Sequence, residues 1–338
     1  MATLGTNLKT LVDRAKSFDP NGKEARIAEL LSQSNEFLAD AVFKEGNLPT
    51  GEQATIRTGL PTTYWRMYNA GTPTSKATSA QITFNCGNLS ARSHVDRDIA
   101  ELNGNVKEFR MNESFAFLEA MSQEMASTAF YGSNANPEEF VGLGNTYTST
   151  SAGNGQNILL AGGASSDNTS VYLIGWSPET IYMTYPKGSV AGLRHEDLGL
   201  DDVEDSNGYV YRAYKDEYTW KSGLVVKDWR YGVRIANIDI SDLVGLSGAQ
   251  EVTDATFLPK LMSRALARIP KRTGIKLAFY CNRTIASLLQ VAAMEKSSSA
   301  LAIQPGLGQF GEEIFTLRFM GVPIRITDAL INTESVIS

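Results

Sequence analysis

Cysteine, histidine and long apolar runs are scarce in this chain of 338 residues. The two cysteines, Cys86 and Cys281, are too few for a disulfide framework or a zinc site, and we interpret them as buried thiols in a reducing compartment. The two histidines, His94 and His195, exclude a metal site of several imidazoles and leave few candidates for a serine triad. No stretch approaches the roughly 18 consecutive apolar residues that would span a bilayer, so we expect no membrane.

A basic surplus is also missing. The net charge is −6, so the composition gives no general electrostatic case for a protein that wraps nucleic acid. Contact with DNA through a local patch stays open. The first residues are polar and amphipathic and lack the apolar core of a secretory signal, so we expect the protein to be made and kept in the cytoplasm.

Motifs of cofactor binding and catalysis are missing or out of context. Residues 306–311 match G-x-G-x-x-G, but Pro305 precedes them and a strand-like segment follows, whereas a dinucleotide site needs a strand before and a helix after. There is no phosphate loop of the G-x-x-x-x-G-K-[ST] type and no G-x-S-x-G elbow. We therefore predict no cofactor and no enzymatic activity.

An acidic run over residues 196–205 is the best metal candidate. Its oxygen-bearing residues could hold calcium, but their spacing departs from the known calcium loop, which favours a solvated acidic loop. They are Asp201, Asp202, Glu204, Asp205 and Asn207. His195 lies beside Glu196, a pairing that would raise the histidine pKa if the two groups touch. A calcium-binding or hydrolytic domain that uses residues 196–207 stays open as an alternative.

One long helix is predicted over residues 112–132. Asn112 can cap its first turn, Glu113 suits the positive end of the helix dipole, and Gly132 can adopt the left-handed conformation that ends a helix. Apolar residues at three- and four-residue spacings give it a wide apolar face. The pattern predicts a core helix around which the chain is organised.

A long β-hairpin is predicted over residues 55–85. Its two arms carry strand-forming and alternating residues, and residues 69–73 supply the turn. An isolated two-stranded ribbon is marginal in water and needs another surface to cover it. No acidic residue lies between Glu52 and Asp96, and the ribbon is cationic, so we expect it to lie on an anionic surface.

The remaining pattern alternates helices and strands without the regular spacing of a doubly wound sheet. Helices are expected over 6–16, 23–41, 94–102, 257–269 and 284–294, and strands over 171–176, 180–185, 209–220, 224–240, 275–281, 313–319 and 322–327. The predicted class is an irregular α+β fold with arms. Periodicity leaves open whether the amphipathic N-terminal arm packs on its own chain or on a neighbouring one.

Several segments together resemble the major capsid proteins of tailed bacteriophages with the Hong Kong 97-like fold, most closely those of short-tailed phages. The segments are LPTTYWRMYNAG (60–71), VDRDIAELNG (95–104), AFYGS (129–133), EEFVGLG (138–144), SVYLIGWSPET (170–180), YPKGSVAGL (185–193), KDWRYGVRIANID (227–239) and FMGVPIRITDAL (319–330). They are spread over most of the chain after residue 50.

The resemblance implies a domain plan. It comprises an N-terminal arm (1–49), an extended loop (50–92), a peripheral domain (93–150) on the spine helix 112–132, and an axial domain (151–338) with strands near 224–240 returning to the peripheral domain. The strand order at the C-terminus departs from the usual family order, which a rearranged connectivity would explain. The covalent cross-linking of some relatives is not implied, because no motif matches its lysine, asparagine and acid.

The resemblance also implies a function. In such shells the axial domains meet at the centre of each hexamer or pentamer, and the extended loop lies over the adjacent subunit. We expect a major capsid protein that self-assembles, in the host cytoplasm, into the hexamers and pentamers of an icosahedral phage head around double-stranded DNA, and that resides in the virion capsid.

The implied partners are other copies of the chain, with portal, scaffolding and decoration proteins as further candidates and packaged DNA touched non-specifically inside. An encapsulin-like nanocompartment shell is the alternative within the same fold. The residues predicted to form the assembly interface are Arg57, Tyr64, Trp65, Arg66, Tyr68, Lys76, Ile82, Phe84 and Arg92.

Overall fold

A computed structural model of the chain describes residues 33, 35–102, 104–164, 166–205, 207–240, 257–294, 301–307 and 313–338. The predicted helix 6–16 and most of the predicted helix 23–41 lie outside these residues. Within the described residues, the short helix α2 (Glu36–Asp40) forms at the C-terminal end of the predicted helix 23–41. None of the helices in the described ranges has the length and apolar character that a membrane span needs.

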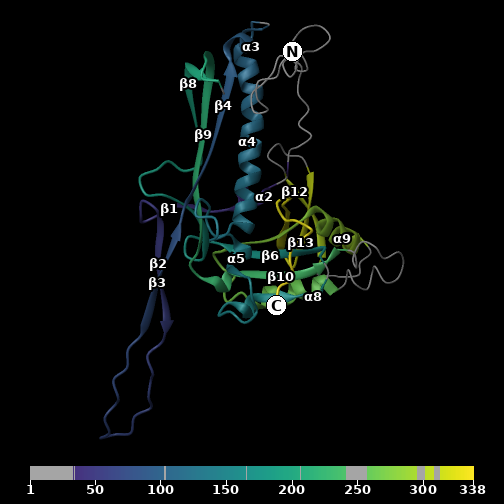
Figure 1. Cartoon of the computed structure of the whole chain (residues 1–338). Coiled ribbons are helices and arrows are strands. Elements are labelled where there is room, and N and C mark those ends of the chain that lie inside the picture. Colours follow the sequence, from purple (N-terminus) through teal and green to yellow (C-terminus); the bar gives the residue numbers. More distant parts are fainter. Residues whose placement is uncertain are drawn as a thin grey trace.

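The fold combines a large mixed sheet with helices on both of its faces, which confirms the predicted α+β class (Figure 1). At the centre of the sheet, β6 pairs with β7, β10 and β11. On one side of this centre, β11 pairs with β14, which is followed by β13 and β12. The strands of this compact part are β1 (Phe43–Glu45), β5 (Ile158–Leu160), β6 (Asn168–Trp176), β7 (Ile181–Tyr185), β10 (Gly232–Asp239), β11 (Lys276–Cys281), β12 (Leu301–Leu307), β13 (Glu313–Phe319) and β14 (Val322–Ile326).

The central strands are buried on both faces, and alternate residues enter two different cores. In β6, Val171 and Leu173 face the first core, whereas Tyr172 and Ile174 face the second, as the two-residue period of a strand requires. The helices α8 (Phe257–Arg268) and α9 (Arg283–Met294) cover the first core. The sheet is therefore the middle layer of a three-layer arrangement.

The second core joins the sheet to α2, to the helix α5 (Leu143–Thr146) and to the end of the long helix α4 (Val106–Tyr131). Phe37 of α2 lies at its centre, fully buried, with its ring 4.8 Å from Phe130, 5.2 Å from Trp176 and 5.4 Å from Tyr280. Aromatic rings at these centroid distances pack favourably. The later part of the predicted N-terminal arm (1–49) is thus part of the core.

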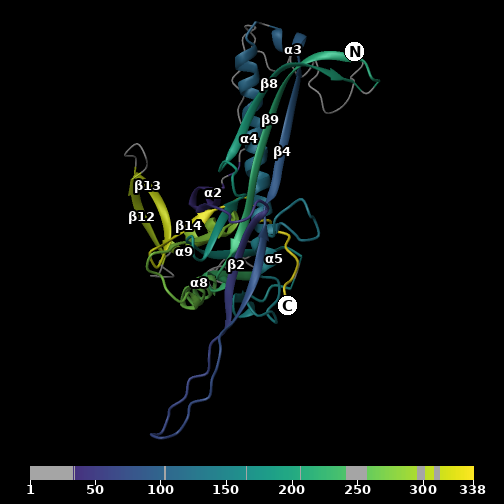
Figure 2. The same ribbon diagram turned by 90° about the vertical axis from the view of Figure 1, so that its left-hand side faces the viewer.

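An elongated part extends from the compact sheet along α4 (Figures 1 and 2). It consists of the N-terminal half of α4, the short helix α3 (Arg97–Glu101), and the strands β4 (Gly87–Asp96), β8 (Leu193–Glu204) and β9 (Val210–Val226). The ring of Tyr218 in β9 stacks on Phe117 of α4 at 5.5 Å, and its hydroxyl donates to Ser114 Oγ at 2.7 Å. Helix and sheet therefore contact each other directly along this part.

The long helix differs from its predicted limits at both ends. It begins at Val106, because the side chain of Asn105 accepts the N–H of Glu108 as a cap, and Asn112 lies inside the helix. Gly132 ends it with φ −49°, which is not the left-handed conformation that we expected. A Cβ there would lie 2.2 Å from the carbonyl oxygen of Phe140, so close backbone approach explains this glycine.

Two other element boundaries also differ from the prediction. The predicted helix 94–102 shortens to α3, because residues 94–96 pair with β9. The predicted strands 209–220 and 224–240 become one unbroken strand, β9, followed by β10. A turn of 3-10 helix, Trp229–Tyr231, capped by Asp228, separates these two strands.

Candidate assembly surfaces

A two-stranded ribbon projects from the junction of the two parts (Figure 2). It is formed by β2 (Gly51–Gly59) and β3 (Thr78–Asn85), which pair only with each other in an antiparallel register from Gly51↔Asn85 to Gly59↔Thr78. The predicted hairpin is therefore present, but its arms are shorter than predicted, because the strands end at Gly59 and resume at Thr78. The predicted loop boundary at residue 92 falls inside β4, which pairs with β9.

The base of the ribbon is anchored in the body of the molecule. Glu52 is 6% exposed; it accepts a hydrogen bond of 2.5 Å from the hydroxyl of Tyr182 and lies 3.5 Å from Lys44 Nζ. Burial and the bond to Glu52 raise the pKa of Tyr182 well above its usual range, so the phenol remains protonated and donates. Phe84, half-buried, packs against the second core. These contacts fix the direction in which the ribbon leaves the body.

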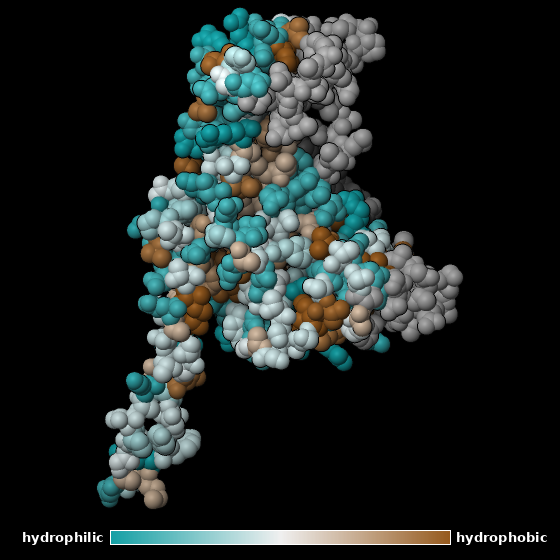
Figure 3. All heavy atoms as spheres, viewed as in Figure 1, coloured by the Kyte–Doolittle hydropathy of each residue, from teal (hydrophilic) through white to brown (hydrophobic). Residues whose placement is uncertain are grey.

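Beyond the paired strands β2 and β3, residues 60–77 form an open tip without strands or helices. Asn69 adopts a left-handed φ of 67°, and the N–H of Ala70 bonds to the Met67 carbonyl, so the chain reverses in the predicted turn region. One side-chain bond, from Ser75 Oγ to the Thr62 carbonyl, joins the two legs. Figure 3 shows the tip as a narrow arm with no other part of the molecule around it.

The aromatic residues of the tip have no cover from the part of the chain that the structure describes. Tyr64 is 51% exposed, Tyr68 96% and Trp65 106%, and Ile82 on β3 is 42% exposed. Monomeric proteins rarely expose several large apolar side chains on one short segment unless another molecule covers them. The exposed set makes the tip a candidate docking surface.

Positive charge accompanies these aromatic residues. Arg57, Arg66 and Lys76 are exposed and form no ion pair with any residue that the structure describes. Arg92 differs: it lies on β4, away from the tip, and its Nη2 is 3.1 Å from Glu217 Oε1. Of the predicted interface residues, the structure places all but Arg92 on the ribbon.

The acidic run 196–205 is a strand, not the loop that we predicted. Its residues through Glu204 form β8, paired along its length with β9. The exposed carboxylates of Asp201 and Asp202 lie 2.7 Å from Lys215 Nζ and 3.3 Å from Arg212 Nε. Successive strand residues point to opposite faces, so these two carboxylates do not converge on one ion. Among the described residues, no group of three or more His, Cys, Asp and Glu side chains is placed to hold a metal.

A charged cluster that the sequence analysis missed joins this sheet to α4. Arg110 Nη2 donates to Asp216 Oδ1 at 2.8 Å and to Asp197 Oδ1 at 2.6 Å, and Asp216 is 5% exposed. His195 contacts Asp216 Oδ1 at 2.9 Å and stacks on Tyr218 at 4.7 Å. Arg110 and His195 thus both contact Asp216, and the cluster links β8 and β9 to α4.

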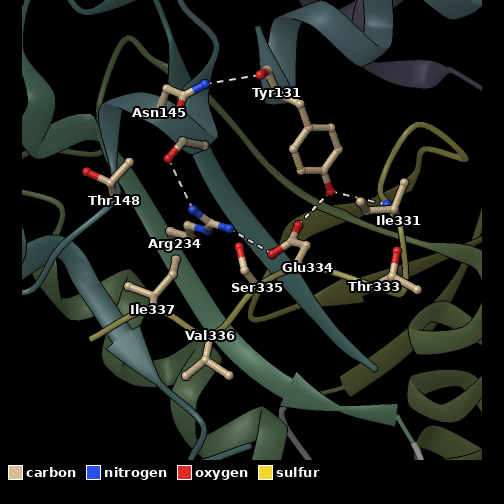
Figure 4. Close-up of a pocket in the computed structure, with 11 residues that line it drawn as sticks. Tyr131, Asn145, Thr148, Arg234, Ile331, Thr333, Glu334, Ser335, Val336 and Ile337 are labelled. Atoms are coloured by element: carbon tan, nitrogen blue, oxygen red, sulfur yellow. Dashed lines mark hydrogen bonds and ion pairs between the residues drawn. The ribbon is translucent and has the colours of Figure 1, made fainter. Parts of the chain in front are cut away.

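A second cluster is buried beneath the C-terminal residues (Figure 4). Arg234 Nη2 lies 2.7 Å from Glu334 Oε2, and both side chains are almost fully buried. Tyr131 donates to Glu334 Oε1 at 2.6 Å, and Arg234 Nη1 donates to the carbonyls of Gly144 and Tyr147. Burial, then Glu334, raises the pKa of Tyr131, so its hydroxyl keeps its proton. In the sequence, Arg234 stands out as a charged residue inside the predicted strand 224–240, and this could have indicated a buried ion pair.

Both cysteines are free thiols. Cys281 is fully buried, as predicted, and Cys86 is half-buried with its thiol 3.8 Å from the Thr184 carbonyl. Burial raises the pKa of Cys86 to about 11 and that of Cys281 to about 12, so neither thiol ionises at neutral pH.

The projecting ribbon with its exposed aromatic residues indicates a structural protein whose surface another molecule covers. Comparison with known protein families and solved structures identifies the kind of assembly. The family model of major capsid protein GP7 matches residues 19–338. The chain belongs to this family of phage major capsid proteins, which form capsid shells.

Solved structures agree. The capsid structure of bacteriophage Epsilon15 has 31% sequence identity, covers 100% of this chain and 99% of its own, and superposes with a TM-score of 0.68. The chain therefore has the Hong Kong 97-like fold of that capsid, as the resemblance implied. The capsid of bacteriophage JBD30 covers 93% of this chain at 11% identity and a TM-score of 0.47, which adds nothing to the assignment. A search of curated proteins finds no match.

Proposed function

We propose that the ribbon β2–β3 joins neighbouring copies of the chain into the hexamers and pentamers of an icosahedral head. The observation that carries the proposal is the exposure of Tyr64, Trp65 and Tyr68 on a ribbon that pairs with no other strand. A two-stranded ribbon alone is marginally stable, and a neighbour's surface supplies the cover that it lacks. Arg57, Arg66 and Lys76 favour an anionic surface on that neighbour.

The proposed contact is heterologous: the ribbon of one copy meets a different surface on the next. Such contacts close into rings when the rotation between copies divides a full turn. Each copy then uses its ribbon once and receives one ribbon, so individually modest contacts add up around the ring. The buried base at Glu52 holds the ribbon at a fixed angle to the body, which favours a constant rotation.

The proposed domains follow the same plan. Residues 1–49 form the arm, 50–92 the extended loop, 93–150 the peripheral domain and 151–338 the axial domain, with strands near 224–240 returning to the peripheral domain. The elongated part around α4 and β4 supports a peripheral domain, and the compact sheet with α8 and α9 supports an axial one. The strands that the axial range contributes to the elongated part are β8 and most of β9, whereas β10 lies in the compact sheet. On this plan the compact parts meet at the centre of each ring.

The proposed content of the shell is double-stranded DNA, touched without sequence preference, and the proposed place of assembly is the host cytoplasm. Portal, scaffolding and decoration proteins are the further proposed partners. Particles from infected cells should protect DNA from nuclease. Particles that hold protein cargo and no DNA would instead favour a nanocompartment shell.

The ribbon proposal is tested by shortening the tip while keeping the pairing between β2 and β3. Residues 60–77 are replaced by Asn-Gly, a two-residue turn that suits a hairpin, so that the pairs from Gly51↔Asn85 to Gly59↔Thr78 remain. The variant should fold with unchanged thermal stability and remain as small species in sedimentation and negative-stain microscopy. Shells of normal size from this variant would contradict the proposal.

The charge of the ribbon is tested with a matched pair of reversals. Arg66→Glu should weaken assembly, because Arg66 lies at the tip without an ion pair in the described part of the chain. Arg272→Glu is the control, since Arg272 is also exposed but lies between α8 and β11, far from the ribbon in sequence. The concentration needed for assembly should rise more for Arg66→Glu than for Arg272→Glu, and equal concentrations would refute the role of the charge.

A further inference from the structure

A row of basic side chains follows the outer side of α8. Lys260 and Arg264 are exposed, and Arg268 is half-buried. Their four-residue spacing places them on one face of the helix, and at 1.5 Å per residue they span about 12 Å along its axis. Lys271, in the loop after α8, is also exposed. We name these four residues the α8 row.

The described part of the chain does not neutralise the α8 row. None of its residues forms an ion pair with a residue that the structure describes. Arg268 Nη1 donates instead to a neutral group, the Ile158 carbonyl, at 3.2 Å. Burial and then the positive charge of Arg264 lower the pKa of Arg268, so an anion beside the two side chains would relieve their repulsion.

The surrounding sequence is equally one-sided in charge. Residues 255–294 contain seven Lys and Arg and no Asp or Glu, whereas the whole chain has a net charge of −6. The α8 row is therefore a positive surface on an acidic protein, and such a surface attracts an anionic partner.

The α8 row faces outward from the compact sheet. The opposite side of α8 carries Leu261, Ala265 and Leu266, which are buried in the first core. The end of α4 packs on the second core, across the sheet, and Figure 1 shows α8 on the side of the sheet away from α4. The row thus lies on a face of the molecule that neither α4 nor α2 covers.

The chemistry of this face favours a phosphate backbone over another protein. Over residues 258–274 no large apolar side chain is exposed, and the exposed positions between the basic residues of α8 are Ser263 and Ala267. Protein interfaces are centred on apolar or aromatic side chains and are depleted in lysine. Each strand of DNA carries one phosphate per roughly 3.4 Å of helix axis, so a row of about 12 Å matches three to four phosphates.

We propose that the α8 row binds the phosphate backbone of double-stranded DNA, and that this face of the compact part lines the inside of the shell. The inference rests on the proposed content of the shell and names the surface that touches it. Phosphate contacts carry no sequence information, so the row suits a shell that encloses DNA of any sequence. Arg272 is not part of the row, because its Nη2 donates to the Leu266 carbonyl at the end of α8.

The test measures binding of a short fluorescent DNA duplex of mixed sequence to the full chain, at a concentration at which it is unassembled. The neutralised variant combines Lys260→Gln, Arg264→Gln and Lys271→Gln, and it keeps Arg268 because that side chain bonds to Ile158. Each lost phosphate contact should reduce the slope of log affinity against log salt concentration by about 0.9, so the variant should lose about 2.7 of this slope.

Two control variants separate charge in the α8 row from net charge. Lys107→Gln, Lys187→Gln and Lys221→Gln together remove the same charge from exposed positions outside α8, and they should leave the slope unchanged. Lys260→Arg combined with Lys271→Arg keeps the charge of the row and should bind DNA like the wild type. All variants should melt at the wild-type temperature, because the replaced side chains are exposed.

The opposite results overturn the proposal. An unchanged slope for the neutralised variant, or an equal loss in the glutamine control, would show that the α8 row does not hold DNA. Normal DNA binding together with a higher concentration needed for assembly would assign the face to a neighbouring copy. The DNA content of the shell is judged separately by nuclease protection in wild-type particles: protected DNA with an unchanged slope would refute the α8 row alone, and particles without DNA would refute the content.

Discussion

Removing the negative charge of Glu334 should destabilise the fold strongly. Glu334→Gln keeps the size of the side chain but leaves Arg234 without its ion-pair partner, and both side chains are at most 6% exposed. Breaking a buried pair from one side costs about 3–5 kcal/mol, because the remaining charge stays buried. The variant also weakens the charge-assisted bonds from Tyr131 and Ser170.

This cost converts into a measurable change in melting temperature. For 338 residues, an unfolding entropy of about 2.1 cal/mol/K per residue gives roughly 0.7 kcal/mol/K, so the expected loss is about 4–7 °C. The assay is differential scanning calorimetry of unassembled protein at low concentration, because assembly would itself raise the apparent stability.

A matched control and a double variant make the test sharp. Glu36→Gln breaks a pair with Arg325 whose side chains are 40% and 32% exposed, and it should cost about 1 kcal/mol or less. Arg234→Met combined with Glu334→Leu removes both charges and should recover most of the lost stability. A melting temperature of Glu334→Gln equal to that of Glu36→Gln would refute the reasoning.

Three further outcomes follow from the same structure. Phe37→Ala should cost about 3–5 kcal/mol in unfolding measurements, because this fully buried ring packs on three aromatic side chains; a loss under 1 kcal/mol would show that α2 is no part of the core. Trp65→Ser should leave the melting temperature unchanged, since the side chain is 106% exposed, but should raise the concentration needed for assembly; a lower melting temperature would contradict this. The hydrogen bond from Arg110 lowers the pKa of Asp197, so its stabilisation is present above the ordinary carboxyl pKa and is lost as the pH falls through the lower folded value. Asp197→Asn should therefore cost up to about 1 kcal/mol at neutral pH and nothing in strong acid, and a cost independent of pH would rule this out.

The sequence predicted features that depend on local pattern. The α+β class, the long helix and the hairpin followed from periodicity and turn residues, and the structure contains all three. The start of the helix was misplaced because Asn105 and Asn112 are both able to cap, and only the surrounding packing selects Asn105. The acidic run was mistaken for a loop because its charged residues indicated exposure to solvent. The run is a strand at the surface that pairs with β9, and local composition does not reveal this pairing.

Long-range contacts could not be predicted in the same way. Arg234 and Glu334 are separated by 100 residues, and nothing near either residue identifies the other. Arg110, Asp197 and Asp216 likewise come from three different elements. The exposed set on the ribbon was predictable, because a cationic stretch without acids that carries aromatic residues is visible in the sequence. Which surface receives the ribbon remains a prediction.

The strand β9 runs unbroken from the elongated part into the compact sheet, where residues 210–222 pair with β4 or β8 and residues 223–226 pair with β7. At the crossing, Gly223 leaves room for the base of the ribbon: a Cβ there would lie 2.8 Å from the Asn85 carbonyl oxygen. The ribbon, the elongated part and the compact part thus meet at Gly223 within one continuous strand. If the ribbon joins neighbouring copies, as we propose, a force on it passes directly into the elongated and the compact part of the sheet through the continuous strand β9.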